Sequence, residues 1–223
     1  PVSTEAFLDH LRTLPDYLGQ MVHVERVAPR AATWANVRRP LAPELVAHLA
    51  DQGITRFYTH QVQAIDAARD GRHVIVATGT ASGKTLCYNV PVLEALMADP
   101  LGRALYLFPT KALAQDQLRA LETVTQGLRS VRAMTYDGDT AQGARARVRR
   151  AASIVLTNPD MLPVGILPNH QTWAPFFRHL RYVVLDEAHV YRGVFGSHLA
   201  NVLRRLRRVC ALHGSNPRFL LSS

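Results

Sequence analysis

Short apolar runs alternate along the chain with longer stretches in which apolar positions recur at helical spacing. The apolar runs have the length and β-branched content of buried strands, and they occupy residues 73–77, 103–108, 131–136, 153–156, 182–185 and 219–221. Helical spacing occupies residues 5–14, 44–52, 61–69, 84–98, 112–125, 143–150 and 197–212. Strands that are apolar throughout are expected where helices cover both sides of a parallel sheet. The alternation therefore predicts an α/β fold, with an open, mostly parallel β-sheet and helices on both faces.

The same pattern divides the chain into two parts. Residues 1–40 hold one helical stretch and a connector with scattered proline and arginine, so we predict an N-terminal extension there. Residues 41–223 hold every expected strand, and we predict that they form one domain. The chain starts at Pro1, and its last apolar run ends beside the final residue, so we expect a fragment of a longer protein.

The composition favours a polyanionic partner. Lys and Arg number 26 against 17 Asp and Glu, which gives a formal net charge of +9. We expect nucleic acid rather than a membrane as the partner, and a merely basic soluble protein is the alternative. The 2 cysteines are too few for a disulfide framework and have no zinc-site spacing. We expect a cytoplasmic protein, because no apolar run reaches membrane-spanning length and the N-terminus has no signal-peptide pattern.

The segment Ala77–Thr85, ATGTASGKT, joins an apolar run to a helical stretch and ends in Gly-Lys-Thr. Its small residues leave backbone N–H groups free to converge on phosphate oxygens at the start of the helix. Lys84 can reach the β- and γ-phosphates, and Thr85 can hold Mg²⁺. The expected ATP-binding residues in this segment are Thr80, Ala81, Ser82, Gly83, Lys84 and Thr85. Thr78 replaces the first glycine of the general pattern, and a simple Gly-Thr-Ser turn is the alternative.

A second apolar strand, 182–185, delivers two adjacent carboxylates, Asp186 and Glu187. Ligands of open α/β sheets lie beyond the carboxyl ends of the strands, so both acids fall where chemistry is expected. Asp186 can hold Mg²⁺ through water, and Glu187 can orient and deprotonate an attacking water molecule. We expect Lys84, Asp186 and Glu187 to be catalytic. The alternative is a strand that ends at a solvated acidic pair.

The sequence Asp186-Glu187-Ala188-His189 matches the D-E-A-H box, and the chain resembles the first RecA-like domain of a superfamily two helicase. This resemblance implies a RecA-like P-loop fold, with ATP and Mg²⁺ as cofactors. It places Gln61 at the Q-motif position, where a glutamine recognises adenine and neighbouring Tyr58 can cover the base. A plain N-terminal helix glutamine is the alternative for Gln61. The resemblance also implies that His189 couples the nucleotide site to the nucleic-acid-binding loops.

Three further strand-end loops belong to the expected site, and two of them resemble family motifs in the family's order. Residues 109–117 resemble motif Ia, residues 157–162 resemble motif Ib, and residues 136–140 form a third strand-end loop. Helix-start N–H groups in such loops suit backbone phosphates. The resemblance implies nucleic-acid contacts by Pro109, Thr110, Lys111, Gly138, Thr157, Asn158, Pro159 and Asp160. Ser222-Ser223 matches the start of the S-A-T motif III.

Residues 78–85 and 191–198 resemble bacterial YprA/MrfA-type helicases and their fungal RecQ-like relatives. This group implies a DNA-repair ATPase that moves 3′ to 5′ on single-stranded DNA, and we expect a monomer. The family's arginine finger comes from a second RecA-like domain, so we expect this fragment alone to turn over ATP poorly.

Two alternatives for the function stay open: an RNA helicase, and a non-catalytic nucleic-acid-binding module with a decayed ATPase. Intact Lys84, Thr85, Asp186 and Glu187 argue against decay. Two basic segments remain, of which 145–150 is a candidate for DNA contact and 204–208 is expected to have a surface or inter-domain role.

Overall fold

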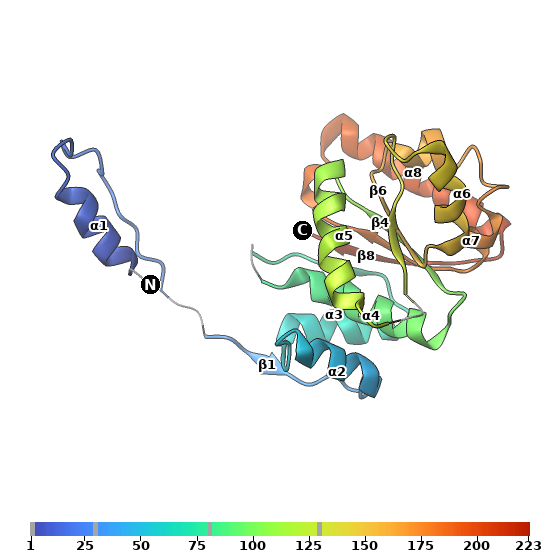
Figure 1. Ribbon diagram of the computed structural model, residues 1–223, viewed down its shortest axis with the longest axis horizontal. Helices are drawn as coiled ribbons and strands as arrows, with labels where there is room; N and C mark the ends of the chain where they lie inside the picture. The colour runs from blue at the N-terminus through green and yellow to red at the C-terminus, as the bar shows by residue number, and fades with distance from the viewer. Residues whose placement is uncertain (1–2, 29–30, 80–81, 129–130) are drawn as a thin grey trace. The chain divides into compact units, whose positions relative to one another are not determined.

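The computed structural model describes residues 3–28, 31–79, 82–128 and 131–223 (Figure 1). Its chain divides into two compact units, Pro1–Ala32 and Thr33–Ser223. The first unit contains helix α1 (Thr4–Arg12), which begins where the Ser3 hydroxyl accepts a hydrogen bond from the Ala6 N–H. The second unit contains the sheet and every expected site residue, and it includes residues 33–40 of the segment assigned above to the extension.

A six-stranded parallel sheet forms the centre of the second unit, with strand order β3-β8-β7-β4-β6-β5. Its strands are β3 (Val74–Val76), β4 (Arg103–Leu107), β5 (Ala133–Thr135), β6 (Ile154–Thr157), β7 (Leu180–Leu185) and β8 (Arg218–Ser222). Each of the apolar runs identified in the sequence forms one of these strands. The expected parallel sheet is confirmed, and its central strands β4, β6 and β7 are buried apart from Arg103, Arg181 and Tyr182, near the starts of β4 and β7.

Alternate residues of each central strand face two separate hydrophobic clusters. In β4, Ala104 and Tyr106 belong to the cluster that also contains side chains of α2 to α5. Leu105 and Leu107 belong to the other, which contains side chains of α6 to α8. The helices of the two groups are α2 (Pro43–Asp51), α3 (Thr59–Arg69), α4 (Lys84–Ala98), α5 (Lys111–Thr125), α6 (Gln142–Ala151), α7 (Ala174–Arg178) and α8 (Gly193–Leu212). Helices therefore cover both faces of the sheet, as expected (Figure 1).

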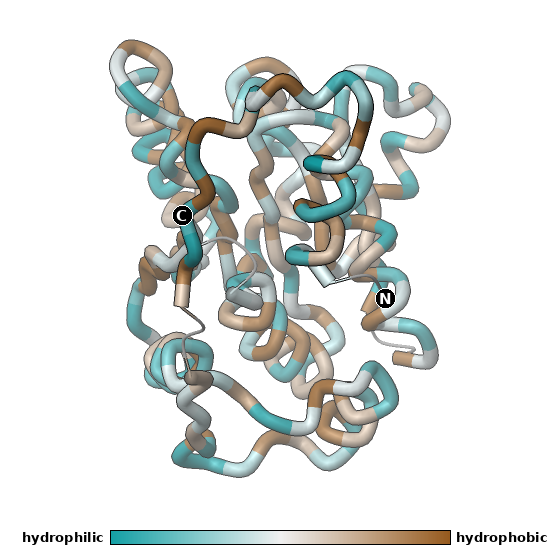
Figure 2. The backbone as a smooth tube through the Cα atoms, turned by 90° about the vertical axis from the view of Figure 1, so that its left-hand side faces the viewer, coloured by the Kyte–Doolittle hydropathy of each residue, from teal (hydrophilic) through white to brown (hydrophobic). Residues whose placement is uncertain are grey.

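Hydrophobic and hydrophilic residues are interspersed along the coloured parts of the backbone (Figure 2). This distribution suits amphipathic helices that bury one side against a sheet. Within the described ranges, no helix has both the length and the apolar content that a membrane crossing needs.

Several elements escaped the sequence analysis. Strands β1 (Trp34–Ala35) and β2 (Phe57–Tyr58) form a small antiparallel sheet, and each is too short for a periodic pattern. A π-helix, η1 (Leu162–Ile166), and a 3-10 turn, η2 (Ala188–Val190), also lack a periodic signal. Helix α7 has only five residues, and α8 begins at Gly193 rather than at 197 because its first turn contains two glycines and looks like a loop in the sequence.

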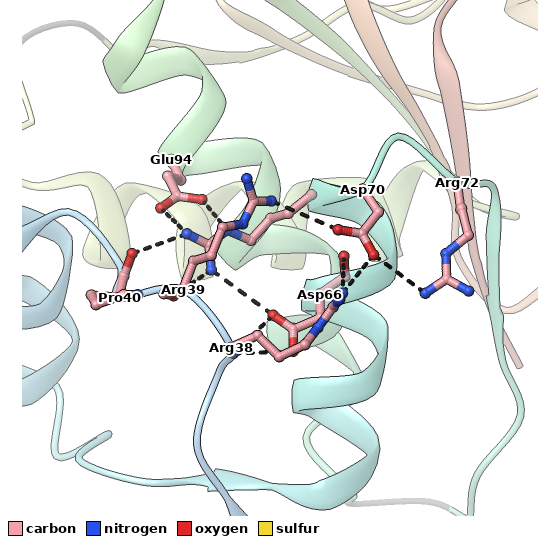
Figure 3. A network of polar contacts seen from close by, with 8 residues as sticks. Arg38, Arg39, Pro40, Asp66, Asp70, Arg72 and Glu94 are labelled. Carbon is pink, nitrogen blue, oxygen red and sulfur yellow. Dashed lines mark hydrogen bonds and ion pairs between the residues drawn. The ribbon is translucent and has the colours of Figure 1, made fainter.

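A network of ion pairs fixes the C-terminal end of α3 (Figure 3). The Arg69 guanidinium contacts the Glu94 carboxylate of α4 at 2.9 Å and donates to the backbone carbonyl of Pro40 at 3.0 Å. Arg38 donates to Asp66, which is buried, and to Asp70. These contacts tie α3 both to α4 and to the segment before α2. Helix α3 matters for the site because its first turn packs against the glycine-rich segment described next.

Candidate active site

The carboxyl ends of the parallel strands all lie at one edge of the sheet, and the expected chemical groups follow them. Strand β8 lies between β3, which leads into the glycine-rich segment, and β7, which ends before Asp186. The chain end joins this arrangement, because the Ser223 N–H donates to the Val76 carbonyl at 2.8 Å. In return, the Thr78 N–H donates to the Ser223 carbonyl at 3.2 Å. Residues 77–79 and 82–85, far from 186–187 in the sequence, are thereby brought to the same edge as these two acids.

Thr78 has a structural role in the glycine-rich loop. Its hydroxyl is 2.7 Å from the hydroxyl of Ser82, which closes the loop from side chain to side chain. Its carbonyl accepts a hydrogen bond from the Lys84 ammonium at 3.2 Å. The residue that departs from the general pattern therefore supplies a hydroxyl that glycine could not. Thr80 and Ala81, expected to bind ATP, lie outside the described residues.

Gly83 fits its position for two reasons. Its φ of 70° is left-handed, a conformation that favours glycine. A Cβ atom at this position would also lie 2.5 Å from Nε2 of Gln61. The Gln61 amide is buried, donates to the Gly83 carbonyl at 3.0 Å and accepts from the Tyr58 N–H at 2.8 Å. The side chain expected to recognise adenine thus also anchors the loop to α3, and adenine recognition stays a prediction.

A stack of rings beside the loop was missed by the sequence analysis. The His60 Nε2 atom is 3.0 Å from the Ser82 carbonyl, and its ring stacks on Tyr58 with 5.7 Å between centroids. Tyr58 in turn stacks on Trp34 at 4.4 Å, and the Arg56 guanidinium lies 4.4 Å from the Trp34 ring centre. His60 could have been noticed because it directly precedes Gln61. Trp34 carried no such signal, since only the β1–β2 pairing brings it to Tyr58.

The Asp186 carboxylate is buried and held by three donors. Tyr88 of α4 donates to Oδ2 at 3.1 Å, the Glu187 N–H donates to Oδ1 at 2.9 Å, and the Ser222 hydroxyl also contacts Oδ1. Burial and the neighbouring Asp186 raise the pKa of Tyr88 well above its ordinary value, so Tyr88 stays protonated and keeps donating.

The donors at this edge fit Mg²⁺. Asp186 offers carboxylate oxygens, and Thr85, in the first turn of α4, carries a hydroxyl. Mg²⁺ commonly uses one or two protein oxygens and completes its shell with substrate phosphates and water. Across the described parts of the chain, no group of three or more His, Cys, Asp or Glu side chains could hold a metal alone. Asp186 and Thr85 suit a metal whose remaining ligands are phosphate and water.

Glu187 has a strained backbone. Its φ of 50° and ψ of 45° make it the one non-glycine residue with a positive φ in the described ranges. Strain of this kind concentrates at functional positions. The Glu187 side chain is partly exposed, and its Oε2 atom is 3.3 Å from Nδ1 of His189. The structure therefore brings together the expected general base and the expected coupling residue.

The three loops expected to contact nucleic acid follow neighbouring strands β4, β6 and β5. The Lys111 ammonium lies 2.8 Å from the Asp139 carboxylate, which raises the pKa of Lys111. A Cβ atom at Gly138 would lie 3.5 Å from that same ammonium. Thr157 is buried, and its hydroxyl donates to the Tyr136 carbonyl, so its side chain joins two of the loops.

The remaining predicted residues divide by exposure. Thr110 and Asp160 are exposed, Pro109 and Asn158 are half-buried, and Pro159 is buried. Two of them also have structural roles: the Thr110 hydroxyl accepts from the Leu113 N–H at the start of α5, and Asn158 accepts from the Met161 N–H.

In the basic segment 145–150, the Arg145 guanidinium donates to the Thr140 carbonyl and lies 5.5 Å from the Tyr136 ring centre.

A parallel α/β sheet with a Gly-Lys-Thr loop after one strand and Asp-Glu after another defines the class of P-loop nucleotide-binding domains. Within this class, the DEAD/DEAH box helicase family matches residues 58–223. The chain belongs to this family.

Named relatives agree with this assignment. The ATP-dependent helicase YprA of Bacillus subtilis is 47% identical over 204 residues, which cover 91% of this chain and 27% of that protein. The ATP-dependent helicase HRQ1 of Saccharomyces cerevisiae is 41% identical over 206 residues, which cover 91% of this chain and 19% of that protein. A crystal structure of the DUF1998 helicase MrfA bound to DNA and AMPPNP has a TM-score of 0.85 and 48% identity, covering 88% of this chain and 28% of that one. The RecA-like fold is confirmed, and the chain spans roughly a fifth to a quarter of these relatives' length.

Proposed function

We propose that this chain is the nucleotide-binding motor domain of an ATP-dependent helicase that acts on DNA. The observation that carries the proposal is the buried Asp186 carboxylate, held by Tyr88 and Ser222 at the sheet edge that also bears the loop around Lys84. The names of the relatives support helicase activity, and the DNA in the MrfA structure favours DNA over RNA.

The residues of the site divide the work of ATP hydrolysis. Lys84 leaves the Thr78 carbonyl and binds the β- and γ-phosphates. Thr85 and Asp186 would hold Mg²⁺, which would neutralise phosphate charge. Glu187 orients a water molecule and accepts its proton as the water oxygen bonds to the γ-phosphorus. The bond from that phosphorus to the β-γ bridging oxygen breaks, giving ADP and phosphate. Residues 186–189 act in this scheme as the DEAH box, with His189 relaying the state of Glu187.

The substrate, direction and cellular role that we propose follow from the resemblance to YprA/MrfA-type helicases. The substrate is single-stranded DNA, tracked 3′ to 5′ by the loops after β4, β5 and β6, and the protein works as a monomer in DNA repair in the cytoplasm. The nearness of Lys111 to Gly138 and Asp139 supports a continuous binding surface across two of these loops. Backbone contacts of this kind position a strand without reading its sequence.

ATP hydrolysis by the full-length protein tests the proposal. Lys84→Ala should abolish nucleotide binding, and Glu187→Gln should keep binding but lower the rate by at least about 100-fold. The Arg12→Ala variant, in the first unit, is the control and should hydrolyse ATP at the wild-type rate. Unwinding of matched DNA and RNA duplexes then separates the substrates. Wild-type turnover by Glu187→Gln would refute the site, and preferential unwinding of RNA would refute the DNA assignment.

A further inference from the structure

The amino-terminal edge of the sheet, opposite the active site, carries a concave surface rich in arginine. One groove of about 600 Å³ lies at the starts of β7 and β8 and is lined by Arg178, Arg181 and Arg218. A second groove of about 610 Å³ shares Ser215 and Asn216 with the first. The second groove adds three arginines of α8, which are Arg204, Arg207 and Arg208. We call these six arginines the arginine surface.

The charge of the arginine surface is mostly uncompensated. The one acidic residue in either lining is Asp99, whose carboxylate lies 2.7 Å from the Arg181 guanidinium. Six arginines against one aspartate leave a formal charge of +5 (6 − 1). In the described parts of the chain, the other five arginines have no carboxylate within ion-pair distance. Like charges gathered in a concave surface repel one another, so an anionic partner would be bound favourably.

The residue types indicate phosphate rather than a protein partner. Guanidinium groups bind phosphate with two parallel hydrogen bonds, and the lining contains six of them. Arg204, Arg207 and Arg208 recur at helical spacing and so present one face of α8. Protein interfaces also use arginine, but they combine it with aromatic or aliphatic anchors. None of the exposed large hydrophobic side chains in the described ranges lies in either lining.

We propose that the arginine surface binds the sugar-phosphate backbone of DNA, as a second contact region distinct from the loops at the carboxyl edge. The two regions are separated by the length of the strands, about 15–20 Å at roughly 3.3 Å per residue. The assignment of DNA as the polyanion rests on the proposed function. A second region of this kind lets the motor hold DNA independently of the nucleotide-dependent loops.

Charge reversal on the 223-residue chain tests this inference. The groove variant is Arg178→Glu, Arg207→Glu and Arg208→Glu, all on exposed side chains. The control variant is Arg26→Glu, Arg119→Glu and Arg205→Glu, which changes net charge equally, and Arg205 is on the same helix but outside the lining. Fluorescence anisotropy with a labelled single-stranded oligonucleotide gives the Kd at several salt concentrations.

The groove variant should weaken DNA binding at least about tenfold, and the slope of log K against log salt should fall by about 2, the value for three lost phosphate contacts. The control variant should weaken binding less than about threefold. An equal loss in both variants, or none in either, would overturn the inference. Arg→Gln at the three groove positions repeats the test without reversed charge, in case the glutamates impair folding. Groove-dependent binding of poly-glutamate at the strength of DNA would overturn it in favour of an acidic protein partner.

Failure of this inference is distinguishable from failure of the proposed function. If Lys111→Ala weakens DNA binding and the groove variant does not, the arginine surface is excluded while the motor assignment stands. If the full-length protein lacks ATPase activity but the groove variant still loses DNA affinity, the motor assignment fails and the surface remains.

Discussion

The two edges of the central sheet are built in opposite ways. The carboxyl edge holds Asp186 and Glu187, a left-handed backbone at two site residues, and a loop whose lysine donates to the Thr78 carbonyl. The amino edge holds the buried pairs of Arg69 and, beyond them, exposed arginines. Strand polarity places the left-handed backbone and the catalytic groups at one edge, and the ion pairs of Arg69 together with the arginine surface at the other. We therefore expect the substitutions that lower stability most at the ion pairs of the amino edge. We expect those that abolish ATP hydrolysis at the carboxyl edge.

Removal of Arg69 is the strongest test of the amino edge. Arg69→Met leaves the Glu94 carboxylate and the Pro40 carbonyl without their main donor, so the free energy of unfolding should fall by about 3 kcal/mol. Arg72→Met is the matched control, because the Arg72 side chain is 65% exposed and lies 3.5 Å from Asp70. The control should lose less than about 0.5 kcal/mol in urea unfolding. Equal losses of unfolding free energy in Arg69→Met and Arg72→Met would show that the pairs of Arg69 stabilise the amino edge no more than an exposed pair does.

Gly83 tests the carboxyl edge with a smaller effect on stability. Gly83→Ala should cost about 2 kcal/mol, roughly half from the left-handed backbone and half from the displaced Gln61 hydrogen bond. Gly53→Ala, at a φ of +76° with open space around it, should cost only the backbone part. Nucleotide binding, measured by calorimetry, should be lost in the first variant and kept in the second. Normal binding by Gly83→Ala would show that the Gln61 contact is dispensable.

The smallest effect is in the pH dependence of Tm. Hydrogen bonding from Arg181 lowers the pKa of Asp99, so this pair stabilises the fold above the unfolded value of about 3.9 and is lost as pH falls through the folded pKa. Asp139 raises the pKa of Lys111, so that pair stabilises below about 10.4 and is lost as pH rises through the folded pKa. Arg181→Gln should reduce only the acid dependence, and Lys111→Gln only the alkaline one. If either variant changed the pH dependence of Tm at both acid and alkaline pH, the assignment of these two ion pairs would be contradicted.

Most of the fold could be predicted because its strands are continuous apolar runs and its helices are periodic. The site was predictable where a local motif carries the chemistry, as in Gly83-Lys84-Thr85 and Asp186-Glu187. Short elements escaped: β1 and β2 have two residues each, and their pairing is what places Trp34 on Tyr58. Likewise, nothing near His60 in the sequence showed that its ring would reach the Ser82 carbonyl.

The sequence by itself determined the class of fold, the family and the residues with chemical capacity, because each depends on spacing within a few neighbouring positions. Only the tertiary structure decided which side chains contact one another. It placed Ser222 and Tyr88 on Asp186, Gln61 on Gly83, and the arginines of four separate elements around two adjoining grooves. These contacts join residues tens of positions apart, and only strand order and helix packing fix which distant residues meet.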